Sequence, residues 1–239
     1  MKTALVTGGA KRIGAKIVKT LHSNNYNVII HYRNSESDAL SLVGALNNKR
    51  KNSATSIQAD LTLIEDINAL RQKISGLDLL VNSASVFYPT PINKVDQDSW
   101  SDIINTNMMA PFFLSTSLSA ALSSTNGCIV NIIDIHSERP LIDHSIYNIS
   151  KSGLAMMTKS LAKDLAPNIR VCGVSPGSIL WPENEHEMSQ NQKNTMIDKI
   201  PLKRQGKAKD IADTVVFLAN SPYITGQIIS VDGGRSLNQ

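Results

Sequence analysis

The sequence has few of the features that mark secreted, membrane-spanning or nucleic-acid-binding proteins. No apolar run approaches the roughly 20 residues that a membrane-spanning helix needs. The first residues, Met1–Gly8, lack the long apolar segment and the small-residue cleavage site of a secretory signal. The net charge is only +4, and no basic run is dense enough to predict binding to nucleic acid. We therefore expect a cytoplasmic protein with neither a membrane nor a nucleic acid as its partner.

Cysteine is also scarce, and histidine shows no pattern of metal ligands. Cys128 and Cys172 both lie in apolar, strand-like runs, which favours buried reduced thiols over a disulfide or a metal site. The five histidines have no metal-ligand spacing, and the acidic stretch at 183–187 is more typical of a solvated loop. We expect no metal. With 41% hydrophobic and 18% charged residues, the composition is that of a globular protein with a substantial core.

Strand-like apolar runs alternate with helical spacing from one end of the chain to the other. This alternation predicts an α/β protein, a parallel doubly wound sheet with helices on both faces. No repeat or linker interrupts it, so we expect a single domain over residues 1–239, with a polar, aperiodic stretch at about 180–199. The expected strands are 4–7, 28–32, 54–58, 77–81, 129–133, 169–174 and 227–231, and the expected helices are 13–24, 35–47, 64–74, 99–122, 145–165 and 210–219.

A glycine-containing loop, Thr7–Gly14, joins the first expected strand to the first expected helix. Glycines allow a tight turn and a close approach of the backbone to a pyrophosphate, which then lies at the positive helix N-terminus. An ordinary strand-to-helix turn is the alternative. The position directly after the first strand favours a dinucleotide-binding loop.

The segment after the second expected strand, His31–Ser35, contains no acidic residue. A site for NAD usually has an Asp or Glu there to bind the ribose 2′-hydroxyl. Arg12 and Arg33 can instead pair with a 2′-phosphate, and Ser35 can donate hydrogen bonds to it. This favours NADP over NAD, although Arg33 could equally be a solvated surface residue.

The third and fourth expected strands are also followed by residues that are able to bind a ligand. Asp60 can accept a hydrogen bond from the adenine amine or can cap a helix. The small residues of Asn82–Ser85 leave room for a ribose. Phe87 offers a ring on which a ligand could stack, or it belongs to the core.

Tyr147 and Lys151 are four residues apart and therefore share a face of the expected helix, with Cβ atoms roughly 5–6 Å apart. A lysine ammonium at this range should lower the pKa of a tyrosine and make it a useful proton donor. The Tyr-x-x-x-Lys pattern is weak alone, since a surface pair explains it equally well.

Taken in order, these residues resemble those of the short-chain dehydrogenase/reductases over essentially the whole chain. The resemblance implies a Rossmann fold with a seven-stranded parallel sheet in the order 3-2-1-4-5-6-7, an NADP(H) cofactor and assembly as a homotetramer. The matching marks are Thr7–Gly14, Asp60, Asn82–Ser85, Asn107, Tyr147 with Lys151, Pro176–Gly177 and Asp232–Gly234.

Within this family the chain is similar to the pteridine reductases. Arg12 replaces the usual middle glycine, Asp134 stands where the usual catalytic serine would be, and the segments His31–Ser35 and Phe87–Pro91 also match. Ser83 departs from the usual second asparagine of its turn, and the residues after Leu180 lie in a substrate loop, at about 180–199, that varies among relatives.

The resemblance implies that the protein transfers hydride from NADPH to a C=N bond of a dihydropterin, with dihydrofolate as a second candidate substrate. The implied catalytic residues are Asp134, Tyr147, Lys151 and Asn107, where Asn107 connects Lys151 to solvent and Asp134 helps to relay a proton to the pterin nitrogen. Ser85, Phe87, Asp134, Tyr147 and Trp181 are the implied substrate contacts. The implied cofactor contacts are Gly8, Lys11, Arg12, Ile13, Gly14, His31, Tyr32, Arg33, Asn34, Ser35, Asp60, Leu61, Asn82, Ala84, Ser85, Tyr147, Lys151, Pro176, Gly177, Ser178 and Ile179.

Two alternatives remain open at this point. The first is a carbonyl reductase of the same fold that acts on 3-oxoacyl thioesters or on a small ketone; Asp134 in place of serine argues against it. The second is a non-catalytic NADP-sensing regulator. Such a regulator would not need Asn107, Tyr147 and Lys151 together.

Overall fold

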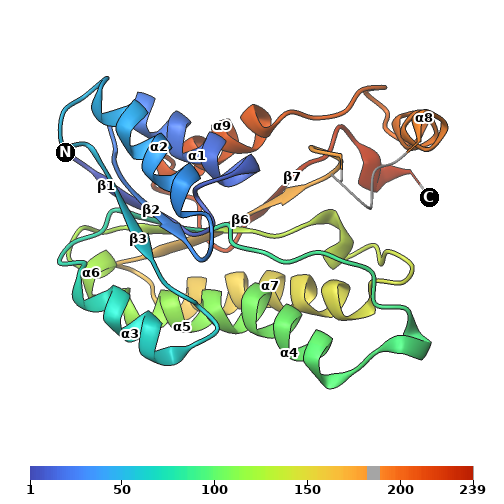
Figure 1. The fold of residues 1–239 in the computed structure, drawn as a ribbon, viewed down its shortest axis with the longest axis horizontal. Coiled ribbons are helices and arrows are strands. Elements are labelled where there is room, and N and C mark those ends of the chain that lie inside the picture. The colour runs from blue at the N-terminus through green and yellow to red at the C-terminus, as the bar shows by residue number, and fades with distance from the viewer. Residues whose placement is uncertain (182–188, 239) are drawn as a thin grey trace.

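The computed structural model describes residues 1–181 and 189–238, and its centre is a seven-stranded parallel sheet (Figure 1). The strand order is β3-β2-β1-β4-β5-β6-β7, which confirms the predicted topology. Every neighbouring pair runs parallel, so all the strands end at the same edge of the sheet. The strands are β1 (Thr3–Val6), β2 (Asn27–Tyr32), β3 (Ala54–Gln58), β4 (Leu79–Asn82), β5 (Cys128–Ile132), β6 (Arg170–Pro176) and β7 (Ile228–Val231).

Helices cover both faces of the sheet (Figure 1). On one face lie α1 (Arg12–Ser23), α2 (Glu36–Asn47) and α9 (Ala208–Ala219). On the other lie α3 (Ile64–Gln72), α4 (Gln97–Ile104), α5 (Ala110–Ser117), α6 (Ser119–Ser123) and α7 (Ser145–Asp164). Over the described residues, no helix is long and apolar enough to cross a membrane.

Each face of the sheet has its own apolar core, which explains why the central strands are apolar at almost every position. All residues of β4 and β5 are buried. In α1, Ile17, Val18 and Leu21 form the buried stripe that the helical spacing predicted. Strands buried on both faces with helical crossovers are typical of parallel sheets.

The helix expected at 99–122 is interrupted, which corrects the prediction of one long helix. After α4 the chain makes a π-helical turn, Asn105–Met109, and then continues as the separate helices α5 and α6. Pro111 explains the first interruption, because proline has no N–H to donate to the carbonyl four residues earlier. The π-helical turn directs Asn107 into the interior.

The stretch predicted to be an aperiodic loop at 180–199 contains a helix, α8 (Gln190–Asp198). Ser189 and Gln192 form a reciprocal capping box at its start. Helical periodicity missed α8 because no side chain in it is buried, so it has no apolar stripe. Residues 182–188 of the expected substrate loop lie outside the described residues.

Candidate active site

The loop after β1 packs so tightly that glycine is required at two positions. Gly8 has a φ of 60°, and a Cβ atom there would lie 2.9 Å from Ala84 Cα. A Cβ atom on Gly14 would lie 2.2 Å from the carbonyl oxygen of Gly8. Larger residues would push the start of α1 away from the end of β4. The loop therefore has the close backbone approach that a dinucleotide pyrophosphate needs.

Two buried side chains stabilise this loop through hydrogen bonds to the backbone. Thr7 Oγ1 accepts hydrogen bonds from the amides of Ser83 (2.9 Å) and Ala84 (3.0 Å). His31 Nδ1 accepts from the Gly8 amide at 3.2 Å, and its Nε2 donates to the Ala59 carbonyl at 3.1 Å, partners that assign the neutral tautomer. Burial lowers the pKa of His31 to about 4. His31 thus supports the loop as a neutral residue, because both ring nitrogens are bonded to backbone.

A small cavity of about 160 Å³ opens beside the glycine loop, at the ends of β1, β2, β3 and β4. It brings together several predicted cofactor contacts, namely Gly8, His31, Arg33, Asp60, Leu61, Ala84 and Ser85. Asp60 Oδ1 accepts from the backbone and the hydroxyl of Thr62, so Asp60 also fixes the start of the following turn.

Thr106, which the sequence analysis did not select, also lines this small cavity. Its Oγ1 is buried and has no hydrogen-bond partner among the described residues. A buried hydroxyl without a partner is costly, and in native proteins such groups often meet a ligand or water. The residues around the cavity therefore fit a cofactor. The only available signal in the sequence was that Thr106 directly precedes Asn107.

The structure places Arg12 and Arg33, predicted to share a 2′-phosphate, in different cavities. Arg33 lines the small cavity, whereas Arg12 lines a larger one and donates from Nη2 to the Trp181 carbonyl at 3.2 Å. Lys11, next to Arg12, forms an exposed ion pair of 3.0 Å with Asp38 of α2. Among the other predicted contacts near β2, Tyr32 is buried and Ser35 is the residue before α2.

The larger cavity, of about 310 Å³, is lined by most of the residues predicted to take part in catalysis or to bind the substrate. It lies at the ends of β4, β5 and β6 and includes predicted residues from the whole length of the chain. Residues near 83, 134–151 and 176–181 come together here although the sequence separates them widely. The predicted residues that line it are Arg12, Ile13, Ser85, Phe87, Asp134, Tyr147, Lys151, Pro176, Gly177, Ser178, Ile179 and Trp181.

Asp134 and Tyr147 form a hydrogen-bonded pair in this cavity. The Tyr147 hydroxyl donates to Asp134 Oδ2 at 2.9 Å, and Asp134 Oδ1 accepts from the His136 amide at 2.9 Å. Burial, together with the charge of Asp134 and its hydrogen bond, raises the pKa of Tyr147 well above its ordinary value. The prediction that the pKa of Tyr147 is lowered is therefore wrong, because burial and the carboxylate outweigh the lysine. Tyr147 stays a phenol and keeps a proton to donate.

Lys151 is buried one turn further along α7. Its Nζ donates to the Ile132 carbonyl at 3.1 Å and lies 5.6 Å from the centre of the Tyr147 ring. Burial lowers the pKa of Lys151 to about 8, and the charge of Asp134 opposes this effect. The lysine therefore changes its charge near neutral pH, whereas the tyrosine does not.

Asn107 is fully buried and contacts the backbone after β4. Its Oδ1 accepts from the Val86 amide at 2.9 Å, and its Nδ2 donates to the Val86 carbonyl at 3.0 Å and to Ser150 Oγ at 3.2 Å. Asn107 thus links the π-helical turn, the loop that carries Phe87, and α7 beside Lys151. Asn82, predicted as a cofactor contact, likewise has its side chain in the core, where Nδ2 donates to Asn131 Oδ1.

Phe87 lies at the wall of the cavity with half of its surface exposed. One face stacks on His144, with ring centres 4.8 Å apart and an angle of 18° between the planes. The Phe87 and Tyr147 rings form a T-shaped pair, with ring centres 4.8 Å apart and an angle of 79° between the planes. His144 was not selected from the sequence. Its stacking holds the Phe87 ring in one orientation.

Arg235, also missed from the sequence, reaches the larger cavity from the turn after β7. Its Nη1 donates to Ser178 Oγ at 2.5 Å. The turn is held by Asp232, whose two carboxylate oxygens accept from the amides of Gly234 (2.9 Å) and Ser236 (2.7 Å). The sequence showed the glycine pair at 233–234 but not where the following arginine points.

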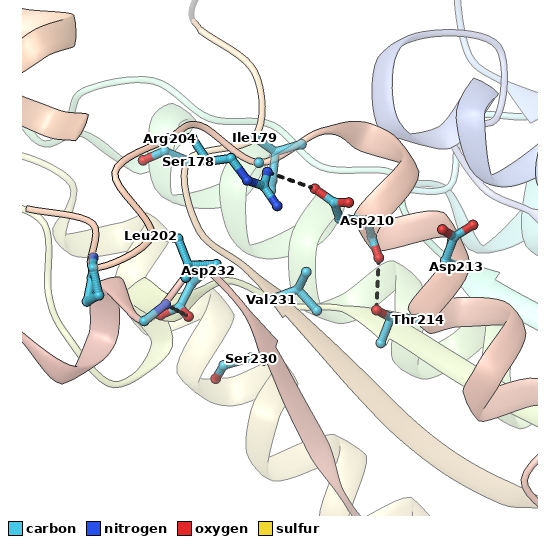
Figure 2. A pocket seen from close by; sticks show the side chains of 14 residues that line it. Ser178, Ile179, Leu202, Arg204, Asp210, Asp213, Thr214, Ser230, Val231 and Asp232 are labelled. Atoms are coloured by element: carbon cyan, nitrogen blue, oxygen red, sulfur yellow. Dashed lines mark hydrogen bonds and ion pairs between the residues drawn. The ribbon is translucent and has the colours of Figure 1, made fainter.

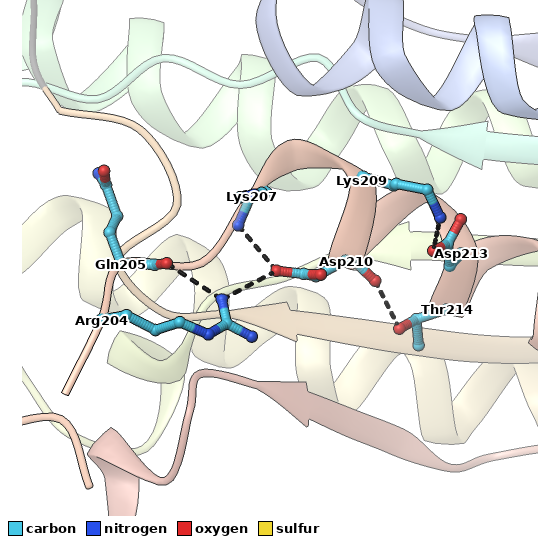
Figure 3. A network of polar contacts seen from close by, with 7 residues as sticks. All are labelled: Arg204, Gln205, Lys207, Lys209, Asp210, Asp213 and Thr214. Atoms are coloured by element: carbon cyan, nitrogen blue, oxygen red, sulfur yellow. Dashed lines mark hydrogen bonds and ion pairs between the residues drawn. The ribbon is translucent and has the colours of Figure 1, made fainter. Parts of the chain in front are cut away.

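A still larger hollow, of about 640 Å³, lies beside β7 and α9, with Arg204, Asp210, Asp213 and Thr214 in its wall (Figure 2). Two of its carboxylates, those of Asp210 and Asp213, already have partners in or next to α9 (Figure 3). Asp210 accepts from the Lys207 amide at 2.8 Å and pairs with Arg204 at 3.7 Å, while Asp213 pairs with Lys209 at 2.5 Å. None of the predicted catalytic residues lines this hollow.

Comparison with known proteins agrees with the geometry of the two cavities. The sequence model of a family described as "Enoyl-(Acyl carrier protein) reductase" matches residues 8–236. The chain is 34% identical to "Pteridine reductase 1" of Leishmania tarentolae, over 99% of this chain and 96% of the relative. It is also 32% identical to "3-oxoacyl-[acyl-carrier-protein] reductase FabG" of Staphylococcus epidermidis, over 98% of both chains, and 33% identical to the protein of the same name from Staphylococcus aureus.

The chain belongs to the short-chain dehydrogenase/reductase family and is an oxidoreductase that uses NAD(P)(H). Its relatives differ in the substrate that their names give, at similar identities. The family therefore sets the reaction type and the cofactor class, and the choice of substrate depends on the residues of this chain's own cavity.

Proposed function

We propose that the protein is an NADPH-dependent reductase of a dihydropterin. The observation that carries this proposal is the hydrogen bond between the Tyr147 hydroxyl and Asp134 Oδ2, at 2.9 Å, inside the larger cavity. The relative named pteridine reductase, at 34% identity, supports it.

A carboxyl next to the tyrosine suits a nitrogen heterocycle better than a ketone. A carbonyl oxygen is activated by hydrogen-bond donors such as a serine hydroxyl, whereas an imine-like ring nitrogen must gain a proton as its C=N bond is reduced. Asp134 can accept the tyrosine proton or carry one itself, so the pair can relay a proton to a ring nitrogen. Asp134 replaces the donor that a carbonyl reductase would need.

The cofactor would lie across both cavities. The glycine loop and the start of α1 would hold the pyrophosphate, Asp60 and Thr106 the adenosine end, and Lys151 the nicotinamide ribose. Arg33, with no acidic residue in 31–35, favours a 2′-phosphate and hence NADP. When bound, the nicotinamide supplies the hydride.

The chain's own residues would then handle the proton and orient the substrate. Tyr147 is a phenol at neutral pH because its pKa is raised, and its hydrogen bond with Asp134 lets the pair pass a proton to the ring nitrogen, after which solvent restores the proton to the pair. Lys151 supplies positive charge when protonated, and Asn107 fixes the loop that carries Phe87. The exposed half of Phe87 offers an aromatic contact for the flat pterin ring, with Ser85 and Trp181 nearby in the cavity wall.

Oxidation of NADPH measured at 340 nm tests the proposal directly. Purified enzyme is expected to oxidise NADPH with dihydrobiopterin or dihydromonapterin, and far more slowly with acetoacetyl thioester. NADH in place of NADPH should raise KM. Turnover of the thioester alone would establish the second candidate, a 3-oxoacyl reductase like the staphylococcal relatives, and would reject the pterin proposal.

Two further predictions belong to this proposal. The protein functions as a homotetramer, which sedimentation or light scattering can measure. It needs no metal, so activity should survive dialysis against EDTA; the described residues contain no group of three or more His, Cys, Asp or Glu that could hold one.

A further inference from the structure

Arg235 has hydrogen-bonding capacity in the larger cavity that the protein does not use. A guanidinium has five N–H donors. Within the described residues, the one hydrogen-bond acceptor of the Arg235 guanidinium is Ser178 Oγ, which itself donates to Met196 Sδ at 3.1 Å. The side chain is half-buried and lines the same cavity as Asp134 and Tyr147. Its remaining donors can therefore meet a ligand.

The backbone turn that carries Arg235 is held in a fixed place, and the hydrogen bond to Ser178 Oγ orients the guanidinium. Gly233 and Gly234 have φ values of 65° and 86°, and a Cβ atom on either would lie within 2.9 Å of Ile200 or Pro201. The Arg139 guanidinium donates to the Asn238 carbonyl, and Asn238 Nδ2 donates to the Lys199 carbonyl at 2.8 Å. The turn that carries Arg235 is thus fastened to two other segments of the chain. Preorganised donors of this kind bind ligands at little entropic cost.

The charges of the cavity also leave Arg235 without a dedicated partner. Arg12, Lys151 and Arg235 bring positive charge to its described wall, and Asp134 brings negative charge. Asp134 already accepts from Tyr147 and from the His136 amide. Burial lowers the pKa of Arg235, and the charges of Asp134 and Asp232 oppose this effect, so the guanidinium feels both carboxylates without an ion pair to either. A negatively charged group on the ligand would offset the excess positive charge of this wall.

Building on the proposed function, we propose that Arg235 binds a negatively charged group on the side chain of the pterin and so selects anionic pterins over neutral ones. A carboxylate or a phosphate ester matches the planar guanidinium, which can offer two parallel N–H donors. The flat ring would stack on Phe87 while its substituent extends towards the turn after β7. Arg235 would thereby act as a specificity-determining residue for the same active site.

Kinetics with pterins that differ in charge test this proposal. Wild-type enzyme is compared with Arg235→Gln, Arg235→Lys and the control Arg204→Gln, which removes the same charge from the hollow beside β7. Dihydrobiopterin serves as the neutral substrate, dihydrofolate as the carboxylate and a dihydropterin phosphate monoester as the phosphate. The two anionic substrates show which of the two anions the site prefers.

For Arg235→Gln we expect kcat/KM for the preferred anionic substrate to fall about 10- to 100-fold, mainly through KM, which corresponds to one charge-assisted hydrogen bond. Turnover of dihydrobiopterin should stay within about twofold. Arg235→Lys should recover part of the loss. Arg204→Gln should leave kcat/KM unchanged for the neutral and the anionic substrates. Unchanged melting temperatures would show that the variants fold.

Two results would overturn the role of Arg235 while leaving the proposed function intact. An equal loss on neutral and anionic pterins would mean that Arg235 acts through Asp134 or through the fold. No loss on either would mean that it does not contact the ligand. Failure of the wild-type enzyme to reduce any of the three pterins would instead reject the proposed function, and the role of Arg235 with it.

Discussion

The cavity that contains Tyr147 and the hollow beside β7 differ in a way that their volumes do not show. The hollow is about twice as large, at about 640 Å³ against about 310 Å³. Its carboxylates, however, already bond to Lys207, Lys209 and Arg204 (Figure 3). In the cavity that contains Tyr147, the Arg235 guanidinium lies in the wall with N–H donors that have no acceptor among the described residues. Unused hydrogen-bonding capacity, rather than volume, distinguishes the candidate active site.

The two regions also differ in what burial does to their ionisable groups. Tyr147 and Lys151 are buried, and burial moves both pKa values away from their ordinary range. The ion pairs of the hollow are exposed, with side chains roughly half accessible to solvent, and exposed pairs contribute little to stability. Substitutions in the two regions should therefore have very different effects.

Tyr147→Phe should have the largest effect. It removes the proton donor but keeps the ring that contacts Phe87. We expect kcat to fall about 10²- to 10⁴-fold, the usual size of a general acid–base contribution. NADPH binding, measured by fluorescence titration, should stay within about threefold. Full activity in this variant would disprove the assigned role of Tyr147.

Asp134→Asn should come next. It keeps the size of the side chain but removes the charge that accepts the Tyr147 proton. We expect kcat with dihydrobiopterin to fall about 10- to 100-fold, with a smaller change in KM. If instead KM rose and kcat were unchanged, Asp134 would only bind the substrate.

The pH dependence of kcat in the wild-type enzyme and in Asp134→Asn gives a second measurement. Lys151 has a pKa of about 8, so it is charged below this pH and neutral above it. If the charged form is needed, wild-type kcat should be level below pH 8 and fall about tenfold per pH unit above it. Because Asp134 raises the pKa of Lys151, the residual activity of Asp134→Asn should begin to fall at a lower pH. An identical alkaline limb in the two enzymes would contradict this coupling.

Thr106→Val should have a moderate effect that is confined to the cofactor. The substitution keeps the shape of the side chain and removes the buried hydroxyl that has no partner among the described residues. If this hydroxyl binds the cofactor, Kd for NADPH should rise about 3- to 10-fold, which is the loss of affinity expected when one neutral hydrogen bond is removed. Tighter binding of NADPH, or a gain in thermal stability with unchanged Kd, would show that the hydroxyl has no ligand to meet.

Asp213→Asn in the hollow should have the smallest effect. It breaks the exposed pair with Lys209, so we expect the melting temperature to change by about 2 °C or less and kcat/KM to stay within about twofold. A tenfold loss of activity without unfolding would show that the hollow takes part in catalysis and would remove the distinction between the two regions.

The sequence predicted a parallel sheet because each strand is a short apolar run bounded by helical spacing, and the order of the strands came from the family resemblance. Prediction was weaker where the backbone departs from regular hydrogen bonding, as at Pro111, or where a helix buries no side chain, as in α8. At most strands and helices, the observed bounds differ from the predicted bounds by a few residues.

Among the site residues, local motifs were sufficient for those on one element and insufficient for those brought in by the fold. Tyr147 and Lys151 share a helix face, so their spacing, although weak alone, selected them together with the other residues of the family resemblance. Arg235 and Thr106 reach the cavities through a left-handed turn and a π-helical turn, which spacing does not show. The direction of the Tyr147 pKa shift also depended on burial and on the position of Asp134 in space.

The place of Arg235 after the last strand has a consequence for how the enzyme becomes active. The cavity takes wall residues from the start of α1 to the turn after β7, and β7 pairs only with β6 at the edge of the sheet. A partly folded chain with β7 undocked would still contain Tyr147 and Asp134 but would lack the wall that Arg235 completes. Recovery of activity towards anionic pterins on refolding should therefore require the docking of this edge strand, whereas turnover of neutral pterins depends less on it.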